Sequence, residues 1–379
     1  MKILFASSSS GSRGGGELFL VYLGKALQQC GHELTLWVSS HPRMDEVSEK
    51  FAHIGKVVRA NYTNTYDRAG RSLAAAFDLA TARRAAREWR ELQPDCIHLN
   101  KQNLEDGLDL LRALSLVKTP SICTIHLTQN AQYLGAKSAR LRDWVARHAL
   151  GRSHVPLVAV LDQRARDLEN FLSAKERIHV VPNGVPKFEV NEIARLEKRR
   201  ELGIADDEVL FIGLGRMVSQ KRPLLFLETA QRILATNPKA RFTWIGDGPL
   251  APEWDAFVDA QNLRAFVQRL PWQSSVQPLL AGADVFLHVA DFEGLPIALL
   301  EAMMAGLPCA ISENLLREMP FLNRENSISV NGSLEIFRDR NALKNIGAAA
   351  RSLAQREFSC EAMAARYESL YQSALEKFK

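Results

Sequence analysis

The sequence predicts an α/β fold that is built twice over. Short apolar runs of strand length alternate with helical patterns along the chain, which is typical of parallel sheets covered by helices. The alternation begins again in the second half without repeating the sequence. At 379 residues the chain also exceeds the roughly 100 to 200 residues of one ordinary domain. We therefore expect two globular domains, residues 1–185 and 186–359.

The first half contains six apolar runs with the length of strands. A helix over residues 17–29 follows the first run, and Gly31 stands where left-handed backbone commonly ends a helix. The six predicted strands are residues 2–7, 33–39, 96–99, 121–126, 157–160 and 178–181.

The second half begins after a turn-rich stretch at residues 182–186 and a charged, helical stretch at residues 189–201. Four strands are predicted, at residues 209–214, 241–245, 266–270 and 285–289, with helices that begin near Lys221, Pro252, Ser274 and Pro296. The chain then ends in a helix with one apolar face, which needs a partner surface. That face consists of Met363, Tyr367, Leu370, Tyr371, Ala374 and Phe378.

Composition excludes several classes of protein. No apolar run approaches the ~20 residues of a membrane-spanning helix, and the apolar start of the chain is too short for a secretory signal. We therefore expect a cytoplasmic protein. The five cysteines are scattered without metal-ligand spacing, so neither disulfides nor a structural zinc is expected.

Charge is distributed unevenly between the halves. Residues 1–185 carry 25 Lys and Arg against 18 Asp and Glu, whereas the remainder carries 23 against 25. The basic half could meet an anionic partner, such as a lipid headgroup, a phosphorylated substrate or nucleic acid. An ordinary solvated surface explains the excess equally well.

A glycine-rich loop, residues 11–17, joins the first predicted strand to its helix. Small residues there allow backbone N–H groups and a helix N-terminus to approach an anion. The loop is not a P-loop, because Glu17 and Leu18 replace the Lys and Ser/Thr, and it is not a dinucleotide fingerprint, because Phe19 replaces a Gly. A tight turn without a ligand is the alternative.

Two cations and two carboxylates mark the second half. Arg216 follows the strand at 209–214, and Lys221 comes five residues later, so both can converge where α/β folds bind ligands. Glu293 precedes the helix between Pro296 and Gly306, and Glu301 lies within it in apolar surroundings, where a carboxylate needs a partner. The pair could face sugar hydroxyls. Surface cations and capping or ion-paired glutamates are the alternatives.

In these motifs and their order, the sequence resembles the retaining glycosyltransferases of family 4, whose fold is called GT-B. The likeness covers nearly the whole chain. The matching features are Gly-Gly-x-Glu at residues 14–17, Thr-x-His at 124–126, residues 181–185, Gly215-Arg216 with Lys221, residues 245–249, residues 283–285, the E-x7-E from Glu293 to Glu301, residues 306–308 and Phe358-Ser359.

The resemblance implies two Rossmann-like domains that face each other across a cleft. The N-terminal domain would bind the acceptor, with residues 360–379 packing back on it, and the C-terminal domain would bind the nucleotide-sugar. It further implies an enzyme of cell-surface polysaccharide, lipopolysaccharide or glycolipid synthesis. No cofactor or divalent metal would be needed, in keeping with the lack of a D-x-D pair.

Residue by residue, the resemblance implies that Arg216 and Lys221 hold the diphosphate, Glu301 the ribose hydroxyls and Glu293 the donor sugar. His126 would lie near the reacting sugar; without the resemblance, a hydrogen-bonded core histidine would be preferred. Glu17, Arg140 and Arg142 fall on the acceptor side. The remaining donor-binding positions would be Gly15, Gly16, Asn183, Gly184, Gly246, Gly248, Leu270, Gly294, Leu295 and Pro296.

Donor and acceptor stay open. Departures such as Arg222 after the lysine and Pro186 after Val185 leave the base and sugar undetermined, with UDP-sugars favoured and GDP-sugars next. A GT-B epimerase or phosphorylase is an alternative, as is an anionic-membrane binder without catalysis. The stretch 137–152 mixes basic and apolar residues, although its charges do not fall on one face. No nucleic-acid-binding motif is present, so nucleic acid is not expected as a partner.

Overall fold

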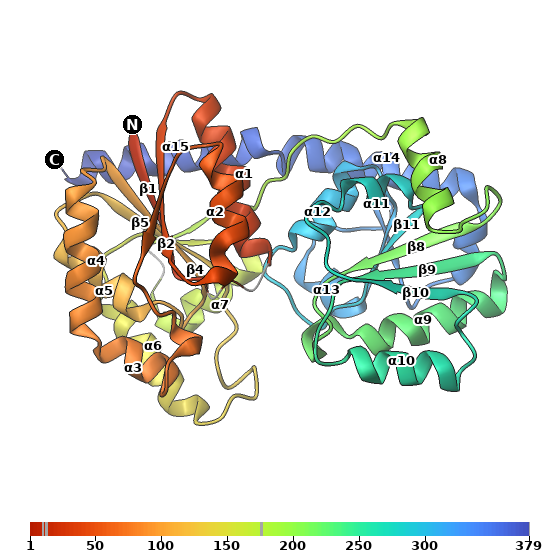
Figure 1. The fold of residues 1–379 in the computed structure, drawn as a ribbon, viewed down its shortest axis with the longest axis horizontal. Coiled ribbons are helices and arrows are strands. Elements are labelled where there is room, and N and C mark those ends of the chain that lie inside the picture. The colour runs from red at the N-terminus through yellow and green to blue at the C-terminus, as the bar shows by residue number, and fades with distance from the viewer. Residues whose placement is uncertain (10, 12–13, 175–176, 379) are drawn as a thin grey trace. The chain divides into compact units, whose positions relative to one another are not determined.

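The computed structural model describes residues 1–9, 11, 14–174 and 177–378. The chain forms two compact units (Figure 1). The first unit comprises Met1–Gly184 and Cys360–Lys379, and the second comprises Val185–Ser359. Val185 goes with the second unit because its N–H donates to the Phe358 carbonyl at 2.9 Å.

The described part of the first unit contains a seven-stranded parallel sheet in the order β3-β2-β1-β4-β5-β6-β7. Because all strands are parallel, their carboxyl ends meet at one edge, where α/β folds place ligands. The strands are β1 (Lys2–Ser7), β2 (Glu33–Ser39), β3 (Lys56–Ala60), β4 (Cys96–Asn103), β5 (Ser121–Leu127), β6 (Leu157–Ala159) and β7 (Ile178–Val180).

Helices cover both faces of this sheet, because successive side chains of a strand point to opposite faces. Ile3 and Phe5 of β1 pack into one core with α1 (Gly15–Gln29) and α2 (Asp45–Ala52), whereas Leu4 packs into the other. Figure 1 shows α1 and α2 on one side of β1 and α4 and α5 on the other. The remaining helices of this segment are η1 (Pro42–Met44), η2 (Thr65–Asp67), α3 (Arg71–Phe77), α4 (Leu79–Glu91), α5 (Leu108–Leu116), α6 (Ala139–Arg152) and α7 (Asp162–Leu172).

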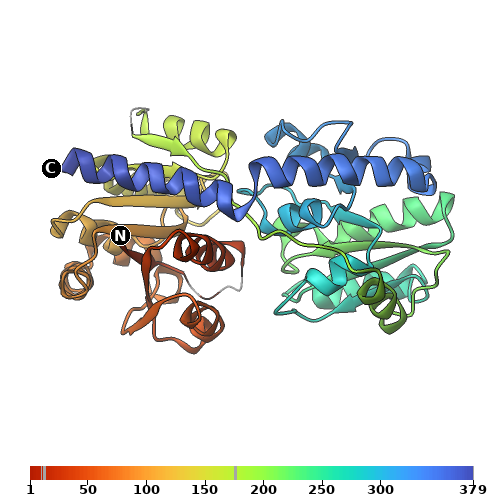
Figure 2. The same ribbon diagram turned by 90° about the horizontal axis from the view of Figure 1, so that it is seen from above.

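The last helix, α15 (Cys360–Phe378), completes the first unit. It lies beside that unit's other elements in Figure 2, in blue near the label C, and contacts α1 and β5. Tyr367 and Tyr371 are fully buried there, and their hydroxyls lie 2.9 Å from Thr124 Oγ1 and 2.7 Å from His98 Nδ1. Most of the predicted apolar face of this helix therefore packs in the first unit, but Phe378, which was also predicted to belong to it, is 53% exposed.

The second unit repeats the architecture with a parallel sheet in the order β10-β9-β8-β11-β12-β13. Its strands are β8 (Val209–Leu214), β9 (Ala240–Ile245), β10 (Val267–Leu270), β11 (Val285–His288), β12 (Cys309–Ile311) and β13 (Ser327–Ser329). Its helices are α8 (Glu192–Glu201), η3 (Ser219–Lys221), α9 (Pro223–Thr236), α10 (Ala251–Ala260), α11 (Gln277–Gly282), α12 (Ile297–Met304), α13 (Glu313–Glu318), η4 (Leu334–Arg338) and α14 (Arg340–Glu357). The predicted α/β fold with two parallel sheets is confirmed.

Candidate active site

In the second unit, glycines bring the loops after β8 and β9 into direct contact. A Cβ on Gly246 would lie 2.3 Å from the carbonyl oxygen of Gly215, and one on Gly248 would lie 2.6 Å from that of Met217. The Met217 N–H donates to the Asp247 carbonyl at 2.9 Å across the same contact. Side chains at these two glycines would push the loops apart, so the glycines are what allows the two loops to pack together at the carboxyl end of β8.

Arg216 and Lys221 both follow β8, but their surroundings differ. Arg216 is exposed, and its guanidinium makes no hydrogen bond or ion pair with any residue that the structure describes. Lys221 is half-buried, and its ammonium pairs with Glu293. One cation is thus available to a ligand, while the other is already held by a carboxylate.

Glu293 is buried in the loop after β11, between Lys221 and His288. Its Oε1 pairs with Lys221 Nζ and lies 3.5 Å from His288 Nε2. Burial alone would raise the pKa of Glu293, but the attraction of Lys221 and His288 outweighs it and holds the pKa at about 2. Burial lowers the pKa of His288, against the pull of Glu293. At neutral pH the site therefore holds a charged Glu293.

Backbone contacts tie the turn that carries Lys221 to the loop that carries Glu293. The Asp291 N–H donates to the Gln220 carbonyl at 2.8 Å, and Gln220 Nε2 donates to the Phe292 carbonyl at 3.0 Å. The position of Lys221 relative to Glu293 is therefore fixed before any ligand binds. Neither Gln220 nor His288 was predicted from the sequence, although β11 and the loop after β8 reach the same edge of the sheet.

Glu301 and the loop before it occupy the positions expected from the sequence, with one correction. Glu301 is the fifth residue of α12 and is buried. Pro296 was expected in the first turn of this helix, but it is the N-cap, with extended backbone (φ −72°, ψ 119°), and Ile297 is the first helical residue. Of the other residues predicted to bind the donor, Leu295 is buried and Gly294 is half-buried. The Leu270 carbonyl accepts a hydrogen bond from the Gly246 N–H at 3.0 Å.

In the first unit, the glycine-rich loop leads into α1 and is closed by its own glutamate. Glu17 Oε2 accepts from the Gly14 N–H at 2.9 Å, and its Oε1 accepts from the Ser9 hydroxyl. Glu17 therefore caps the helix, as a carboxylate at this position often does. Gly15 begins α1, and a Cβ on Gly16 would overlap the Gln102 amide. Ser12 and Arg13 of the predicted loop lie outside the described residues.

His126 lies at the end of β5 and is joined to α1 through Asn100. Asn100 Nδ2 donates to the Gly16 carbonyl at 3.1 Å, which turns its Oδ1 toward His126 Nε2 at 2.8 Å. Nε2 must then carry the proton. Burial lowers the pKa of His126 to about 4, so the imidazole is neutral at pH 7. Asn100 was missed because an asparagine inside an apolar strand carries no distinctive pattern.

The other predicted first-unit residues fall into two groups. Asn183 is buried, and the Gly184 N–H points at Met363 Sδ at 3.1 Å, so this turn rests on α15. On α6, Arg142 Nε donates to Glu105 at 2.8 Å and forms an ion pair with it. Arg140 is exposed and bonds to no described residue.

The chemistry of the two sites differs. The second unit offers an unpaired guanidinium, an ammonium and the buried Glu293 carboxylate in the loops at the carboxyl edge of its sheet, and buried Glu301 lies in the helix that follows; this set suits an anion together with hydroxyl groups. The first unit offers a neutral imidazole and the N-terminal turn of α1, a set suited to neutral hydroxyls and hydrogen-bond acceptors.

Comparison with known proteins places the chain in a family. Residues 13–187 match Glycosyltransferase Family 4, and residues 207–340 match Glycosyl transferases group 1. A UDP-Gal:alpha-D-GlcNAc-diphosphoundecaprenol alpha-1,3-galactosyltransferase from Escherichia coli is 33% identical over 135 residues, 33% of this chain and 34% of that protein. The chain thus spans about a third of this relative's length.

Other matches extend over the whole chain. N-acetyl-alpha-D-glucosaminyl L-malate synthase from Bacillus anthracis is 22% identical over 99% of this chain and 98% of its own. The crystal structure of HepE from Anabaena with UDP and glucose matches with a TM-score of 0.79 at 16% identity, covering 98% of this chain and all of that one. The two matched segments account for most of the sequence, and the structural likeness gives the fold, so the chain belongs to glycosyltransferase family 4 and has the GT-B fold.

Proposed function

We propose that the protein is a retaining glycosyltransferase that moves a sugar from a UDP-sugar to an acceptor hydroxyl in the synthesis of a cell-surface polysaccharide, lipopolysaccharide or glycolipid. The observation that carries the proposal is the ion pair of Lys221 with Glu293 at the carboxyl edge of the second sheet, beside the backbone of Gly215 that leads into Arg216. GDP-sugars are the second choice of donor.

The second unit supplies the donor site. The leaving group of the reaction is a nucleoside diphosphate, whose negative charge grows as the sugar departs. Arg216 and Lys221 stabilise this charge, and because Glu293 sets the position of Lys221 in advance, this ammonium needs little reorganisation during the reaction. Glu293 accepts from sugar hydroxyls and Glu301 from the ribose hydroxyls. With two cations serving the diphosphate, no divalent metal or other cofactor is required.

The first unit supplies the acceptor side. His126 is neutral and is held by Asn100, so it can accept or donate a hydrogen bond near the reacting sugar without carrying charge. Glu17 keeps the first turn of α1 in place. The galactosyltransferase of E. coli is named for a lipid-diphosphate acceptor, which supports a glycan or lipid-linked acceptor here.

We also propose that the protein works in the cytoplasm, at the inner face of the membrane. No helix among the described residues is long and apolar enough to cross a membrane. However, Tyr133, Leu134, Leu141 and Trp144 are 59%, 38%, 48% and 59% exposed on α6 and the loop before it. Exposed Lys137 and Arg140 accompany them. Aromatic, aliphatic and basic side chains together suit an anionic lipid interface.

The donor is tested by thermal shift and transfer assays. A donor present at 100 times its Kd should raise the free energy of unfolding by about 2.7 kcal/mol, so UDP, GDP and ADP and their sugars can be ranked by melting temperature. Product analysis with and without an acceptor then separates transfer from epimerisation or phosphorolysis. NMR of the new linkage tests retention: an inverted anomeric centre would contradict the proposal.

A further inference from the structure

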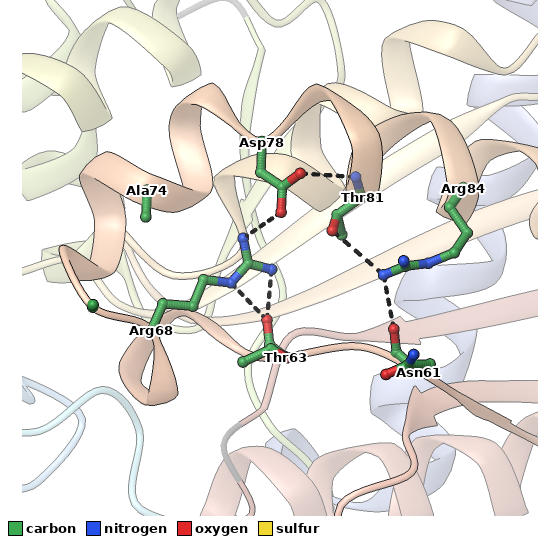
Figure 3. Close-up of a pocket in the computed structure, with 8 residues that line it drawn as sticks. Asn61, Thr63, Arg68, Ala74, Asp78, Thr81 and Arg84 are labelled. Carbon is green, nitrogen blue, oxygen red and sulfur yellow. Dashed lines mark hydrogen bonds and ion pairs between the residues drawn. The ribbon is translucent and has the colours of Figure 1, made fainter.

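A polar pocket of about 570 Å³ opens on the first unit where the chain leaves β3 (Figure 3). Because β3 is parallel to β1 and β4, the pocket lies at the ligand-binding edge of the sheet. None of its lining residues was singled out from the sequence. They are Asn61, Thr63, Arg68, Ala69, Ala74, Asp78, Thr81 and Arg84.

Arg68 forms the fixed wall of the pocket. Its guanidinium donates to Asp78 at 3.0 Å, to buried Asp109 at 2.5 Å and to the Thr63 carbonyl at 2.8 Å. Asp78 in turn accepts from the Thr81 N–H at 2.9 Å and caps α4. Asp78, the carboxylate among the lining residues, is therefore hydrogen-bonded and shares the charge of Arg68 with Asp109, so it repels an incoming anion less than a bare carboxylate would.

Arg84, by contrast, has no carboxylate partner among the described residues. Its NH2 donates to the Asn61 carbonyl at 2.8 Å and approaches the Thr81 hydroxyl at 3.4 Å (Figure 3). A guanidinium has five N–H donors in a fork that matches phosphate and carboxylate oxygens. The N–H groups on Nε and NH1 therefore remain for a ligand, and this half-buried guanidinium forms no ion pair with a described residue, since Asp78 acts on it only at longer range.

Two exposed apolar residues are the sequence neighbours of Asp78, which lines the pocket. Phe77 and Leu79 precede and follow Asp78, and they are 71% and 45% exposed. An exposed apolar pair beside a guanidinium suits a molecule that joins a phosphate to an apolar chain, although a soluble phosphate ester would satisfy Arg84 equally well.

We propose that this pocket binds the phosphate group of a phosphorylated acceptor, with Arg84 as its main contact and the hydroxyls of Thr63 and Thr81 as further donors. The assignment to the acceptor rests on the proposed function, whereas the phosphate site itself does not. Every residue that lines the pocket belongs to the first unit, and neither Arg216 nor Lys221 is among them.

The test compares Arg84→Gln with Arg83→Gln in the full-length protein. Arg83 is the preceding, exposed residue of α4 and does not line the pocket, so it controls for loss of surface charge. Inorganic phosphate is titrated by calorimetry, and binding to phosphatidylcholine vesicles with and without phosphatidic acid is measured by sedimentation. Arg84→Gln should weaken phosphate binding by on the order of 10- to 100-fold, and Arg83→Gln by less than about two-fold.

The outcomes separate the possibilities. Arg84-dependent binding of free phosphate indicates a soluble ester, and Arg84-dependent binding of phosphatidic acid vesicles alone indicates a lipid headgroup. Equal losses of phosphate binding in Arg84→Gln and Arg83→Gln, or no Arg84-dependent binding of either phosphate or phosphatidic acid vesicles, would contradict the proposed phosphate site. Thr63→Val, which keeps every charge, should give a smaller loss of the same binding. If UDP-sugar transfer fails while Arg84-dependent phosphate binding persists, the proposed function falls and the phosphate site stands.

Discussion

The two candidate sites keep their protonation states by opposite means. In the second unit, Glu293 stays charged because Lys221 and His288 lie against it. In the first unit, His126 stays neutral because burial disfavours its charged form. The difference follows the roles that we propose: fixed charges in the second unit bind a diphosphate and donor-sugar hydroxyls, whereas an uncharged imidazole in the first unit forms hydrogen bonds near the reacting sugar. The comparison also shows that Lys221 serves the protein, through its ion pair with Glu293, as well as the proposed ligand.

The largest expected effect comes from the two cations. Lys221→Ala and Arg216→Ala should each lower transfer by on the order of 10² to 10³, because each removes a donor to the developing charge. Only Lys221→Ala should also destabilise the second unit, by about 3 kcal/mol, since it leaves Glu293 buried without its ammonium. Steady-state kinetics and denaturant unfolding measure the two effects.

A double variant checks this interpretation. Lys221→Ala with Glu293→Gln should recover most of the stability but none of the transfer. A loss of stability in Arg216→Ala as large as in Lys221→Ala would show that the ion pair is not the cause.

The next effect separates the two glutamates. Glu301→Gln should weaken UDP and UDP-sugar alike, because it alters a contact to the ribose, by about ten-fold. Glu293→Gln should weaken the UDP-sugar more than UDP. Calorimetric titration of both ligands into both variants gives the four affinities, and equal losses for UDP and UDP-sugar in Glu293→Gln would contradict its sugar contact.

Acid should affect the two units at different pH. His126 ordinarily has a pKa of 6.5 and is held at about 4, so the folded first unit binds fewer protons than its unfolded chain. Its contribution to stability is complete above pH 6.5 and is lost, by about 3 kcal/mol, as the pH falls toward 4. For Glu293 the corresponding window runs from 4.5 down to about 2.

Hydrogen exchange measured between pH 7 and 3 should therefore show the first unit opening before the second. His98, whose pKa burial and His126 lower to about 3, adds to the same trend. In His126→Asn the acid sensitivity of the first unit should diminish, and the second unit should be unchanged. Loss of protection in the second unit first would contradict these assignments.

The smallest effect concerns the exposed surface of α6. Lys137→Gln with Arg140→Gln should reduce binding to anionic vesicles several-fold, and raising salt from about 0.05 to 0.5 M should do the same, since the Debye length shrinks from roughly 14 to 4 Å. Arg142→Gln is a poor control, because Arg142 is paired with Glu105. Trp144→Ala should weaken vesicle binding at every salt concentration, and donor affinity should stay constant throughout.

The sequence predicted the fold better than it predicted the contacts. All ten predicted strands are present because their apolar runs are long and bounded by turns. The three that were missed lack that pattern: β3 has charged residues at Lys56 and Arg59, and β12 and β13 have only three residues each. For the site, the sequence pointed to Lys221 and Glu293 and allowed ion-paired glutamates as an alternative, but it did not identify Lys221 as the partner of Glu293. The residues that line the pocket after β3 were not predicted, because Arg68 and Arg84 belong to an ordinary basic stretch of the sequence. Only the fold gives these two arginines different partners.

The position of α15 has a consequence for how the chain is made. Residues 360–378 follow the second unit in the sequence, yet Tyr367 and Tyr371 fill the core of the first. During synthesis the second unit is complete as a continuous segment, whereas the first keeps the part of its sheet around β5 uncovered until α15 leaves the ribosome. His98 and Thr124 lack their tyrosine partners in that interval. The half of the protein that is translated first is therefore the half that finishes folding last.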